Sequence, residues 1–247
     1  MTGTQTIYGL HAVRAMLSKH PERVTLVRIA ERRDDPRVKV IEDLAREQSR
    51  PVQRIDAHAL KKLLGDVTHQ GVAADVEPLP PWTDDDLFTA LGSARNPIIL
   101  ALDGVQDPHN LGACLRTADA CGALAVIVPK DRAAQLTPTV RKVAAGAAET
   151  TPLVVVTNLV WTLKVLKESA LWVIGADTDA EKQAYEADLS GGIVLVMGAE
   201  GAGLRQLTQQ TCDLMVRLPQ FGSVESLNVS VATGMLLYEA VRQRQQT

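Results

Sequence analysis

The pattern of apolar and polar positions divides the chain into two series of alternating strands and helices. In the front series, short apolar runs rich in Val and Ile have the length of strands, and amphipathic stretches with helical spacing separate them. The expected strands are 24–30, 52–55 and 72–76, and the expected helices are 8–17, 37–48 and 57–64. This series predicts a small α/β domain over residues 1–77.

The second series begins at Pro97 and has continuously apolar strands. Expected strands are 98–103, 123–128, 153–156, 172–176, 193–197 and 214–218, and expected helices are 111–121, 138–147, 159–167, 204–210 and 227–244. Apolar strands that alternate with helices are typical of a parallel sheet covered on both faces. The fold class is therefore predicted as α/β with a mostly parallel sheet, in a domain over 97–247.

The stretch between the two series, residues 78–96, differs in composition. It opens with three prolines at 78, 80 and 81, followed by three consecutive aspartates at 84–86. Prolines and clustered charges are typical of exposed connections. We predict a linker here.

Composition limits the class of protein. No run of 18 apolar residues and no signal-peptide pattern occur, which predicts a soluble, cytoplasmic protein without a membrane partner. The three cysteines have no CxxC spacing and the five histidines no paired-ligand spacing, so neither a disulfide framework nor a metal is expected. A net charge of −3 argues against a grossly electrostatic nucleic-acid binder.

The distribution of charge is more informative than its sum. Residues 1–80 hold 13 Lys and Arg against 11 Asp and Glu, whereas 97–247 hold 12 against 15. The basic residues of the front part cluster at Arg28, Arg32, Arg33, Arg37, Lys39, Arg46, Arg50 and Arg54. Two interpretations remain open: a solvated helix face interleaved with acids, or a patch that faces RNA.

Ligands of parallel α/β sheets bind outside the carboxyl ends of the strands, which directs attention to three loops. In the first loop, 102–119, Asn110 lies where a helix begins and Arg116 lies six residues further. An Arg near a helix N-terminus opposes the helix dipole, so a phosphate or carboxylate contact explains it better than stability does. Asp119, three residues later, is a possible intrahelical partner of Arg116.

The second loop is Met197-Gly-Ala-Glu-Gly-Ala-Gly203. Its glycines follow the order GxxGxG instead of the GxGxxG of a dinucleotide fingerprint, and Glu200 lies where a pyrophosphate would meet a negative charge. A nicotinamide cofactor is therefore disfavoured. Close approach of backbone to an uncharged ligand is expected instead, with Glu200 accepting from a ribose hydroxyl or pairing with Arg116.

The third loop, 217–234, places polar side chains at the start of a helix. Ser223, Ser226 and Asn228 follow Pro219 and Gly222, and they are either helix caps or part of a ligand site.

No Ser-His-Asp context, Walker lysine or catalytic carboxylate pair is present. The three loops therefore favour group transfer from a donor that is already reactive, and a sulfonium methyl donor without a metal fits.

Taken together, the loops resemble a known family. NLGACLRTADACG at 110–122, LVMGAEGAGLRQLT at 195–208 and LPQFGSVESLNVSVATG at 218–234 are similar to the three motifs of the SpoU (TrmH) RNA ribose 2'-O-methyltransferases of the SPOUT class. YGLHAV at 8–13 and THQGVAA at 68–74 resemble the family's N-terminal substrate-binding domain, which has a ribosomal-protein-like fold. The resemblance covers nearly the whole chain.

The resemblance implies a C-terminal trefoil knot, a homodimer with the last helix in the interface, and S-adenosylmethionine as methyl donor. An apolar stripe on that helix fits either dimer contact or core: Val231, Met235, Tyr238 and Val241. The donor would be held mainly by backbone at Met197, Gly198, Gly203, Leu218 and Leu227. The functional polar set carried over from the family is Asn110, Arg116, Glu200, Ser226 and Asn228.

A guanidinium stays protonated in proteins, so we assign Arg116 the role of positioning the target phosphate and stabilising the developing alkoxide, not that of a base. Asn110, Glu200 and Asn228 would fix the loops. One departure from the family pattern is Leu218-Pro219-Gln220 where Ile-Pro-Met is usual, which places the polar Gln220 beside the donor pocket.

Within the family, the chain looks most like the bacterial enzymes that methylate a guanosine in the peptidyl-transferase-centre loop of 23S ribosomal RNA. The implied partner is 23S rRNA or a large-subunit precursor. Two alternatives stay open. One is a tRNA ribose 2'-O-methyltransferase of the same family, and the other is a non-catalytic RNA-binding factor of ribosome assembly.

Overall fold

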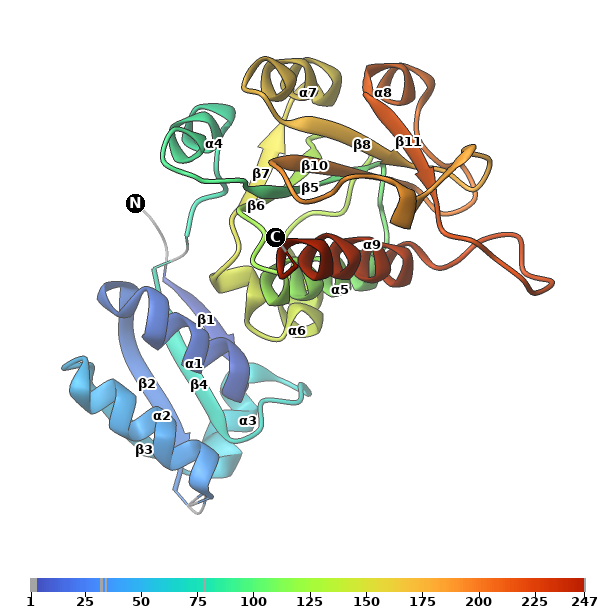
Figure 1. Ribbon diagram of the computed structural model, residues 1–247. Coiled ribbons are helices and arrows are strands. Elements are labelled where there is room, and N and C mark those ends of the chain that lie inside the picture. Colours follow the sequence, from blue (N-terminus) through green and yellow to red (C-terminus); the bar gives the residue numbers. More distant parts are fainter. Residues whose placement is uncertain (1–3, 32, 34, 78, 247) are drawn as a thin grey trace. The chain divides into compact units, whose positions relative to one another are not determined.

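The computed structural model describes residues 4–246 except 32, 34 and 78, so Arg32 of the basic cluster and Pro78 of the expected linker lie outside the described residues. The chain forms two compact units (Figure 1). Unit 1 comprises residues 1–80 together with 145–150, and unit 2 comprises 81–144 and 151–247. No helix in the described part of the chain is long and apolar enough to cross a membrane.

Unit 1 is a four-stranded mixed sheet in the order β1-β4-β2-β3, in which β4 is antiparallel to both of its neighbours. Its elements are β1 (Gln5–Tyr8), α1 (Leu10–Lys19), β2 (Val24–Ala30), α2 (Pro36–Glu47), β3 (Val52–Ile55), α3 (Ala57–Leu64) and β4 (Val72–Val76). Side chains of a strand alternate between faces, so Val72 and Ala74 pack in one apolar cluster with α1 and α2, and Ala73 packs with Leu60 of α3. Both faces of the sheet are therefore covered.

The start of unit 1 differs from the sequence-based expectation of a helix from residue 8. Gln5–Tyr8 is the edge strand β1, paired with β4, and α1 begins only at Leu10. Gly9 lies between them with a φ of 93°, a conformation that stops a helix from extending backward. The apolar pattern of a four-residue edge strand is too short to reveal a partner almost seventy residues away.

Five arginines of the basic cluster of unit 1 pair with neighbouring acids. Arg28 lies 2.6 Å from Asp75, and Arg54 lies 2.6 Å from Glu42. Shorter-range pairs involve the remaining arginines on and before α2: Arg33 and Arg37 with Asp35, and Arg46 with Glu42 and Asp43. The structure therefore favours the interleaved, solvated face over a dedicated basic patch at these residues.

Unit 2 is a seven-stranded sheet in the order β7-β6-β5-β10-β8-β11-β9, and every strand pair described is parallel. Its strands are β5 (Ile98–Asp103), β6 (Ala125–Pro129), β7 (Leu153–Val156), β8 (Trp172–Ala176), β9 (Lys182–Gln183), β10 (Ile193–Gly198) and β11 (Leu214–Arg217). Its helices are α4 (Asp84–Leu91), α5 (Pro108–Ala120), α6 (Pro138–Ala144), α7 (Leu159–Glu168), α8 (Gln206–Thr211) and α9 (Val229–Arg244). The predicted α/β class with a mostly parallel sheet is confirmed.

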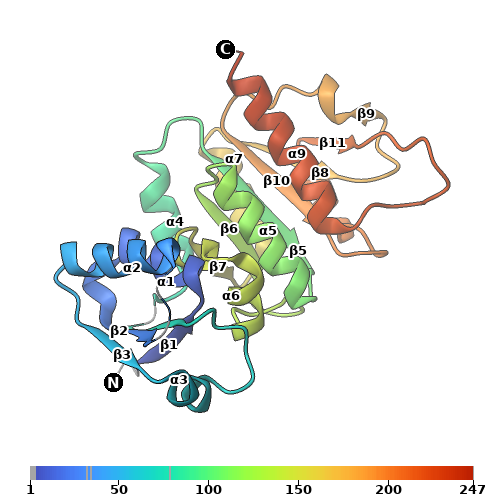
Figure 2. The same ribbon diagram turned by 90° about the horizontal axis from the view of Figure 1, so that it is seen from below.

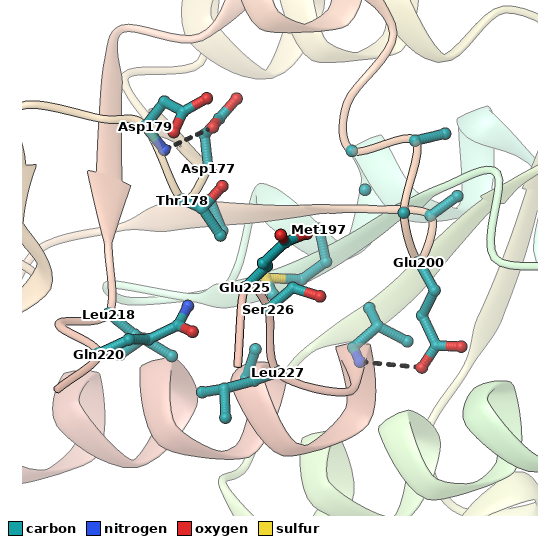
Figure 3. A pocket seen from close by; sticks show the side chains of 18 of the residues that line it. Asp177, Thr178, Asp179, Met197, Glu200, Leu218, Gln220, Glu225, Ser226 and Leu227 are labelled. Carbon is teal, nitrogen blue, oxygen red and sulfur yellow. Dashed lines mark hydrogen bonds between the residues drawn. The ribbon is translucent and has the colours of Figure 1, made fainter. Parts of the chain in front are cut away.

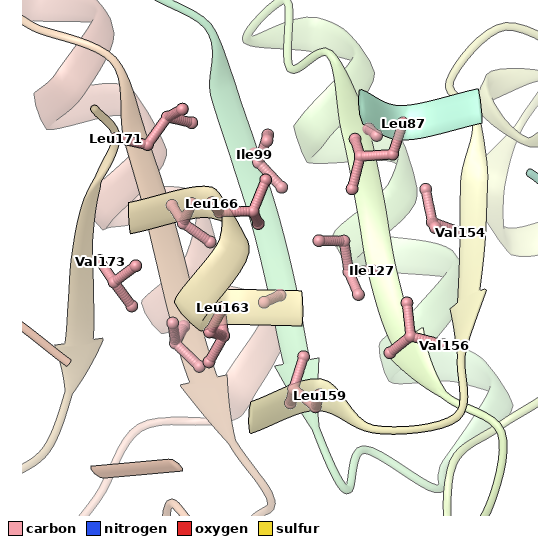
Figure 4. Packing of buried hydrophobic residues seen from close by; sticks show 14 of the residues in the cluster. Leu87, Ile99, Ile127, Val154, Val156, Leu159, Leu163, Leu166, Leu171 and Val173 are labelled. Carbon is pink, nitrogen blue, oxygen red and sulfur yellow. The ribbon is translucent and has the colours of Figure 1, made fainter. Parts of the chain in front are cut away.

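Helices cover both faces of this sheet. Figure 1 shows α7 and α8 on one face and α5 and α9 on the other, and in Figure 2 α5 and α9 lie in front of the strands. Leu159, Leu163 and Leu166 of α7 pack on strand residues such as Ile127 and Val173 (Figure 4). All six residues of β5 are buried, which explains why its sequence is apolar from Ile98 to Leu102, before the final Asp103.

Helix α4 lies inside the stretch that composition predicts as a linker. Thr83 and Asp86 form a reciprocal capping box that starts the helix, and Leu87 is fully buried in the core of unit 2. Trp82 pairs with Val154 beside β7. The three aspartates therefore belong to a helix N-terminus, where negative charge is favourable, and not to an extended linker.

Candidate active site

The site is built where the carboxyl ends of neighbouring strands meet. Gly198, the last residue of β10, is in register with Asp103, the last residue of β5. On the other side of β10 lies β8, followed by β11. The loops that leave these four strands share one edge of the sheet, which is the edge where ligands bind in open parallel sheets.

The loop after β10 is a tight backbone turn. Ala199 and Gly203 exchange two backbone hydrogen bonds, of 3.1 and 2.9 Å, while Gly201 and Gly203 have φ angles of 73° and 64°. A Cβ on Gly198 would lie only 2.2 Å from the carbonyl carbon of Gly203. Glycine is therefore required at 198 by close backbone approach, and at 201 and 203 by left-handed conformation.

A buried carboxylate anchors the end of this loop. Asp103 is 1% exposed and accepts hydrogen bonds from the backbone N–H of Arg205 at 3.0 Å and from its Nε at 2.6 Å. A second guanidinium nitrogen of Arg205 also lies 2.6 Å from the carboxylate. This fork of charge-assisted contacts ties the glycine loop to the end of β5.

The side chain of Asn228 joins the three loops that carry the sequence motifs. Its Nδ2 donates to Oδ1 of Asn110 at 3.0 Å and to Oε1 of Glu200. Its Oδ1 accepts from the backbone N–H of Ser230 at 3.0 Å and so caps α9, while Glu200 also accepts from the N–H of Val229 at 3.4 Å. One amide thus connects α5, the glycine loop and α9.

A cavity of about 410 Å³ opens between these loops (Figure 3), a volume typical of small-molecule sites. Backbone of the glycine loop forms one wall, and residues after β11 form another. Four acids line it, namely Asp177, Asp179, Glu200 and Glu225, and its described lining contains no Lys, Arg or His. Such a lining favours a cationic ligand and opposes a pyrophosphate.

Two family models match the chain. One is the SpoU rRNA Methylase family, over residues 97–238, and the other describes RNA 2'-O ribose methyltransferase substrate binding, over residues 6–82. The chain belongs to the SpoU methylase family.

Individual SpoU proteins are similar over the full length. A 23S rRNA (guanosine-2'-O-)-methyltransferase RlmB of Pseudomonas putida is 53% identical, over 99% of each chain. The SpoU methyltransferase AviRb of Streptomyces viridochromogenes, solved with the cofactor AdoMet, is 25% identical with a TM-score of 0.79, covering 99% of this chain and 92% of its own. A TrmH/SpoU tRNA modifying enzyme of A. aeolicus, 29% identical with a TM-score of 0.57, covers 66% of this chain and 83% of its own.

Most of the SpoU site residues expected from sequence line the cavity. These are the five donor-binding candidates, Met197, Gly198, Gly203, Leu218 and Leu227, together with Glu200 and Ser226. Asn110 and Asn228 do not line it, but Asn228 donates to Glu200 of the cavity lining and also to Asn110.

Arg116 lies apart from the cavity lining. It is exposed on α5 and has no hydrogen-bond or ion-pair partner among the described residues. The two partners that the sequence suggests for it are engaged elsewhere: Glu200 accepts from Asn228, and Asp119 accepts from Thr151 at 3.1 Å. Its guanidinium is therefore available to an external anion.

Sequence reasoning missed the acids at the end of β8 and the buried Asp103. Asp177, Thr178 and Asp179 line the cavity directly after this strand, and Asp103 is the final residue of β5. The sequence did contain a pattern that identifies them, because polar residues at the end of an apolar strand lie at the edge of a parallel sheet where ligands bind.

Cys114 and Cys212 are poorly suited to act as nucleophiles. Burial raises the pKa of the Cys114 thiol to about 11 and that of Cys212 to about 12. Both thiols therefore stay protonated at neutral pH, and thiols are poor nucleophiles in that form. Within the described residues, no three His, Cys, Asp or Glu side chains are arranged to hold a metal ion.

Proposed function

We propose that the protein is an S-adenosylmethionine-dependent RNA methyltransferase that methylates the 2'-hydroxyl of a guanosine in 23S ribosomal RNA, in the peptidyl-transferase-centre loop. The observation that carries this proposal is the 53% identity, over 99% of both chains, to a methyltransferase of that named specificity. The full-length match also favours ribosomal over transfer RNA, because the match to the tRNA-modifying enzyme covers only 66% of the chain.

The cavity suits this donor. S-adenosylmethionine carries a positively charged sulfonium whose methyl group is activated for transfer, and the acids Asp177, Asp179 and Glu225 favour a cation. Apolar side chains of Leu218 and Leu227 can pack on a flat base. The close backbone turn at Gly198 leaves peptide groups, not side chains, as hydrogen-bonding partners on the remaining wall.

In the proposed reaction, the ribose 2'-oxygen forms a C–O bond to the methyl carbon as the C–S bond breaks, and the electron pair of that bond stays on sulfur, which becomes a neutral thioether. The hydroxyl proton passes to solvent water. Arg116 would bind the RNA phosphate beside the target and stabilise the developing negative charge on the 2'-oxygen. Its free, exposed guanidinium supports this role. Asn110, Glu200 and Asn228 hold the loops, and Ser226 lies on the pocket wall beside the reacting groups.

We further infer that this protein has the domain roles and the oligomeric state that the resemblance to the family implies. Residues 1–77 bind the RNA substrate through a ribosomal-protein-like domain, and 97–247 form a SPOUT methyltransferase domain with a trefoil knot after β10.

The protein forms a homodimer through α9, because Val231, Met235 and Tyr238 on that helix are 51%, 49% and 68% exposed and are not core. A substrate of 23S rRNA or a large-subunit precursor implies a cytoplasmic enzyme.

Mapping of 2'-O-methyl groups in ribosomal RNA from cells with and without the protein tests the proposal. We expect one guanosine of 23S rRNA to lose its methyl group in the absence of the protein and to regain it on incubation with purified protein and S-adenosylmethionine. Loss of a methyl group from a tRNA instead would contradict the assigned substrate. An unchanged methylation map together with retained RNA binding would indicate a non-catalytic assembly factor.

A further inference from the structure

Arg132 lies at the sheet edge where the donor cavity opens. It follows the carboxyl end of β6, in the loop that leads to α6. A Cβ on Gly104, the residue after β5, would lie 4.0 Å from the carbonyl oxygen of Arg132 and 3.8 Å from the Cβ of Ala199. Ala199 belongs to the glycine loop and lines the cavity. Gly104 is therefore flanked by Arg132 and by a wall of the donor cavity.

Arg132 has a backbone conformation that is unusual for its residue type. Its φ angle is 56°, in the left-handed region that favours glycine. The backbone N–H of Ala134 donates to the carbonyl of Val105 at 2.9 Å and ties this turn to the loop after β5. The Nε2 of Gln135 donates to the carbonyl of Lys130 at 3.3 Å and closes the turn. Glycine would adopt the same conformation without strain, so the local fold does not account for an arginine side chain here.

The side chain of Arg132 is an unpaired cation on this edge of the sheet. It is exposed and forms no hydrogen bond or ion pair within the described part of the chain, and the adjacent Asp131 does not pair with it. Arg205 differs, because its guanidinium is occupied by Asp103. Arg132 is in this respect like Arg116, and its guanidinium is available to an external anion.

The charge of the cavity indicates which external anion fits this position. Four acids line the cavity and repel a polyanion such as RNA. An RNA strand whose ribose reaches the cavity carries a phosphate on each side of that ribose, and these phosphates need positive partners outside the acid-lined wall. A guanidinium can form two parallel hydrogen bonds to a phosphate. Arg132 lies beside the cavity and not in its lining, which is the position that a flanking phosphate requires.

We propose that Arg132 is a further RNA-binding residue and that its guanidinium binds a phosphate that flanks the target ribose. Arg116 and Arg132 hold the strand at two points, from α5 and from the loop after β6, while the acids of the cavity face the donor. This inference rests on the proposed function, since it requires an RNA strand whose ribose approaches the cavity.

The test measures binding of the full-length protein to an RNA hairpin that carries the peptidyl-transferase-centre loop of 23S rRNA, by fluorescence anisotropy over a series of salt concentrations. We expect Arg132→Gln to raise the dissociation constant about tenfold, as for loss of a hydrogen bond to a charged group. The slope of log K against log salt concentration should become shallower by about 0.7, the share of one phosphate contact on a single strand. Arg132→Lys should keep the wild-type slope, because it keeps the charge. Affinity for S-adenosylhomocysteine should be unchanged in both variants, because Arg132 does not line the donor cavity.

Arg132→Gly separates the side chain from the backbone turn. Glycine accepts the left-handed conformation, so this variant should fold as the wild type does and bind RNA as weakly as Arg132→Gln. Wild-type RNA affinity of Arg132→Gly would show that the position serves only the turn and would overturn the proposal.

Arg95→Gln is the matched control, because Arg95 is an exposed arginine just before β5, at the opposite edge of the sheet. It should keep the wild-type affinity and slope, and a loss equal to that of Arg132→Gln would overturn the assignment to a specific contact. An unchanged slope in Arg132→Gln would overturn the inference while leaving the proposed function intact. A wild-type protein that does not bind the 23S hairpin would overturn the proposed function and this inference with it.

Discussion

At the scale of single residues, the site contains enclosed residues that maintain its shape and an exposed side chain that can contact a substrate. Gly198 and Asp103 are enclosed by backbone and protein atoms, whereas Arg116 is exposed. This contrast predicts different consequences of substitution. Changes at enclosed residues should alter donor binding, and changes at the free arginine should alter methyl transfer to RNA without altering donor binding.

Substitution Arg116→Lys keeps the positive charge but removes the planar fork of donors. We expect methyl transfer to 23S rRNA to fall by about 10²–10³-fold, the range for loss of one group that stabilises transition-state charge. The affinity for S-adenosylhomocysteine should stay unchanged, because Arg116 does not line the donor cavity. A tritiated-methyl assay and calorimetry measure the two quantities, and wild-type methylation by the variant would refute the role.

Substitution Gly198→Ala forces a Cβ to within 2.2 Å of the Gly203 backbone, where nothing can yield without displacing the loop. We expect a stability loss of about 1–3 kcal/mol, as for other overpacking changes, and loss of detectable donor binding. Gly222→Ala is the control, since no atom lies within 4 Å of its Cβ position and both properties should be retained. Tight donor binding by Gly198→Ala would contradict the close-approach argument.

At the scale of elements, pairs of oppositely charged residues connect segments that are distant in sequence. Asp103 ties β5 to the loop after β10 through Arg205. In unit 1, Arg28 of β2 pairs with Asp75 of β4. The carboxylates of both pairs are largely withdrawn from water, so removal of one partner should cost more than breaking a surface ion pair, because the remaining charge is left unpaired.

Substitution Asp103→Asn removes the charge that orders the glycine loop. We expect the dissociation constant of S-adenosylhomocysteine to rise about tenfold, which corresponds to the loss of a hydrogen bond to a charged group. Arg205→Ala should have a similar effect, and the double variant should lose little more than either single one. Additive losses in this cycle would show that the two residues act independently.

The Arg28–Asp75 pair predicts a pH dependence of stability. The hydrogen bond from Arg28 holds the pKa of Asp75 below its usual range. A lowered carboxyl pKa stabilises the fold above the unfolded-state pKa, about 3.9, and this contribution is lost as pH falls through the folded-state value. Asp75→Asn should cost about 1–3 kcal/mol at pH 7 in urea unfolding, and the difference from wild type should shrink at pH 3. A difference that persists at pH 3 would exclude this linkage.

At the scale of the whole molecule, the proposed homodimer depends on apolar residues of α9 that the single chain leaves exposed to solvent. The apolar stripe on α9 is compatible with core or interface from sequence alone, and its exposure in the structure removes the first possibility for three of its four residues. A contiguous apolar strip on a helix is costly to leave in water. This exposure supports α9 as the subunit contact of the proposed homodimer.

The double substitution Met235→Glu and Tyr238→Glu introduces two charges into this stripe. In size-exclusion chromatography with light scattering, we expect the wild type to have about twice the 26.6 kDa chain mass and the variant to be monomeric, because unpaired buried charges oppose association. Leu207→Glu, at a residue of α8 that is 66% exposed, should leave the mass unchanged. A dimeric double variant would exclude α9 as the interface.

The sequence by itself determined most of the strands and helices and the three loops that carry the family motifs. Continuous apolar strands require burial on both faces, and this dictates a parallel sheet with ligands at its carboxyl edge. The glycine order and Glu200 disfavour a dinucleotide cofactor with its pyrophosphate, and the three motifs indicate the family. Local patterns carried this information because strand periodicity and turn chemistry depend on neighbouring residues.

Only the tertiary structure decided which distant residues meet. The pairing of Asp103 with Arg205 and of Asn110 with Asn228 spans more than one hundred residues, a separation that no local pattern encodes. The pairing of Arg28 with Asp75 and of Arg54 with Glu42, and the packing of 84–91 as α4, likewise depend on neighbours supplied by other elements. Gln220 stands at the same boundary: its polarity is visible in the sequence, but its unpaired place on the pocket wall is a property of the folded chain.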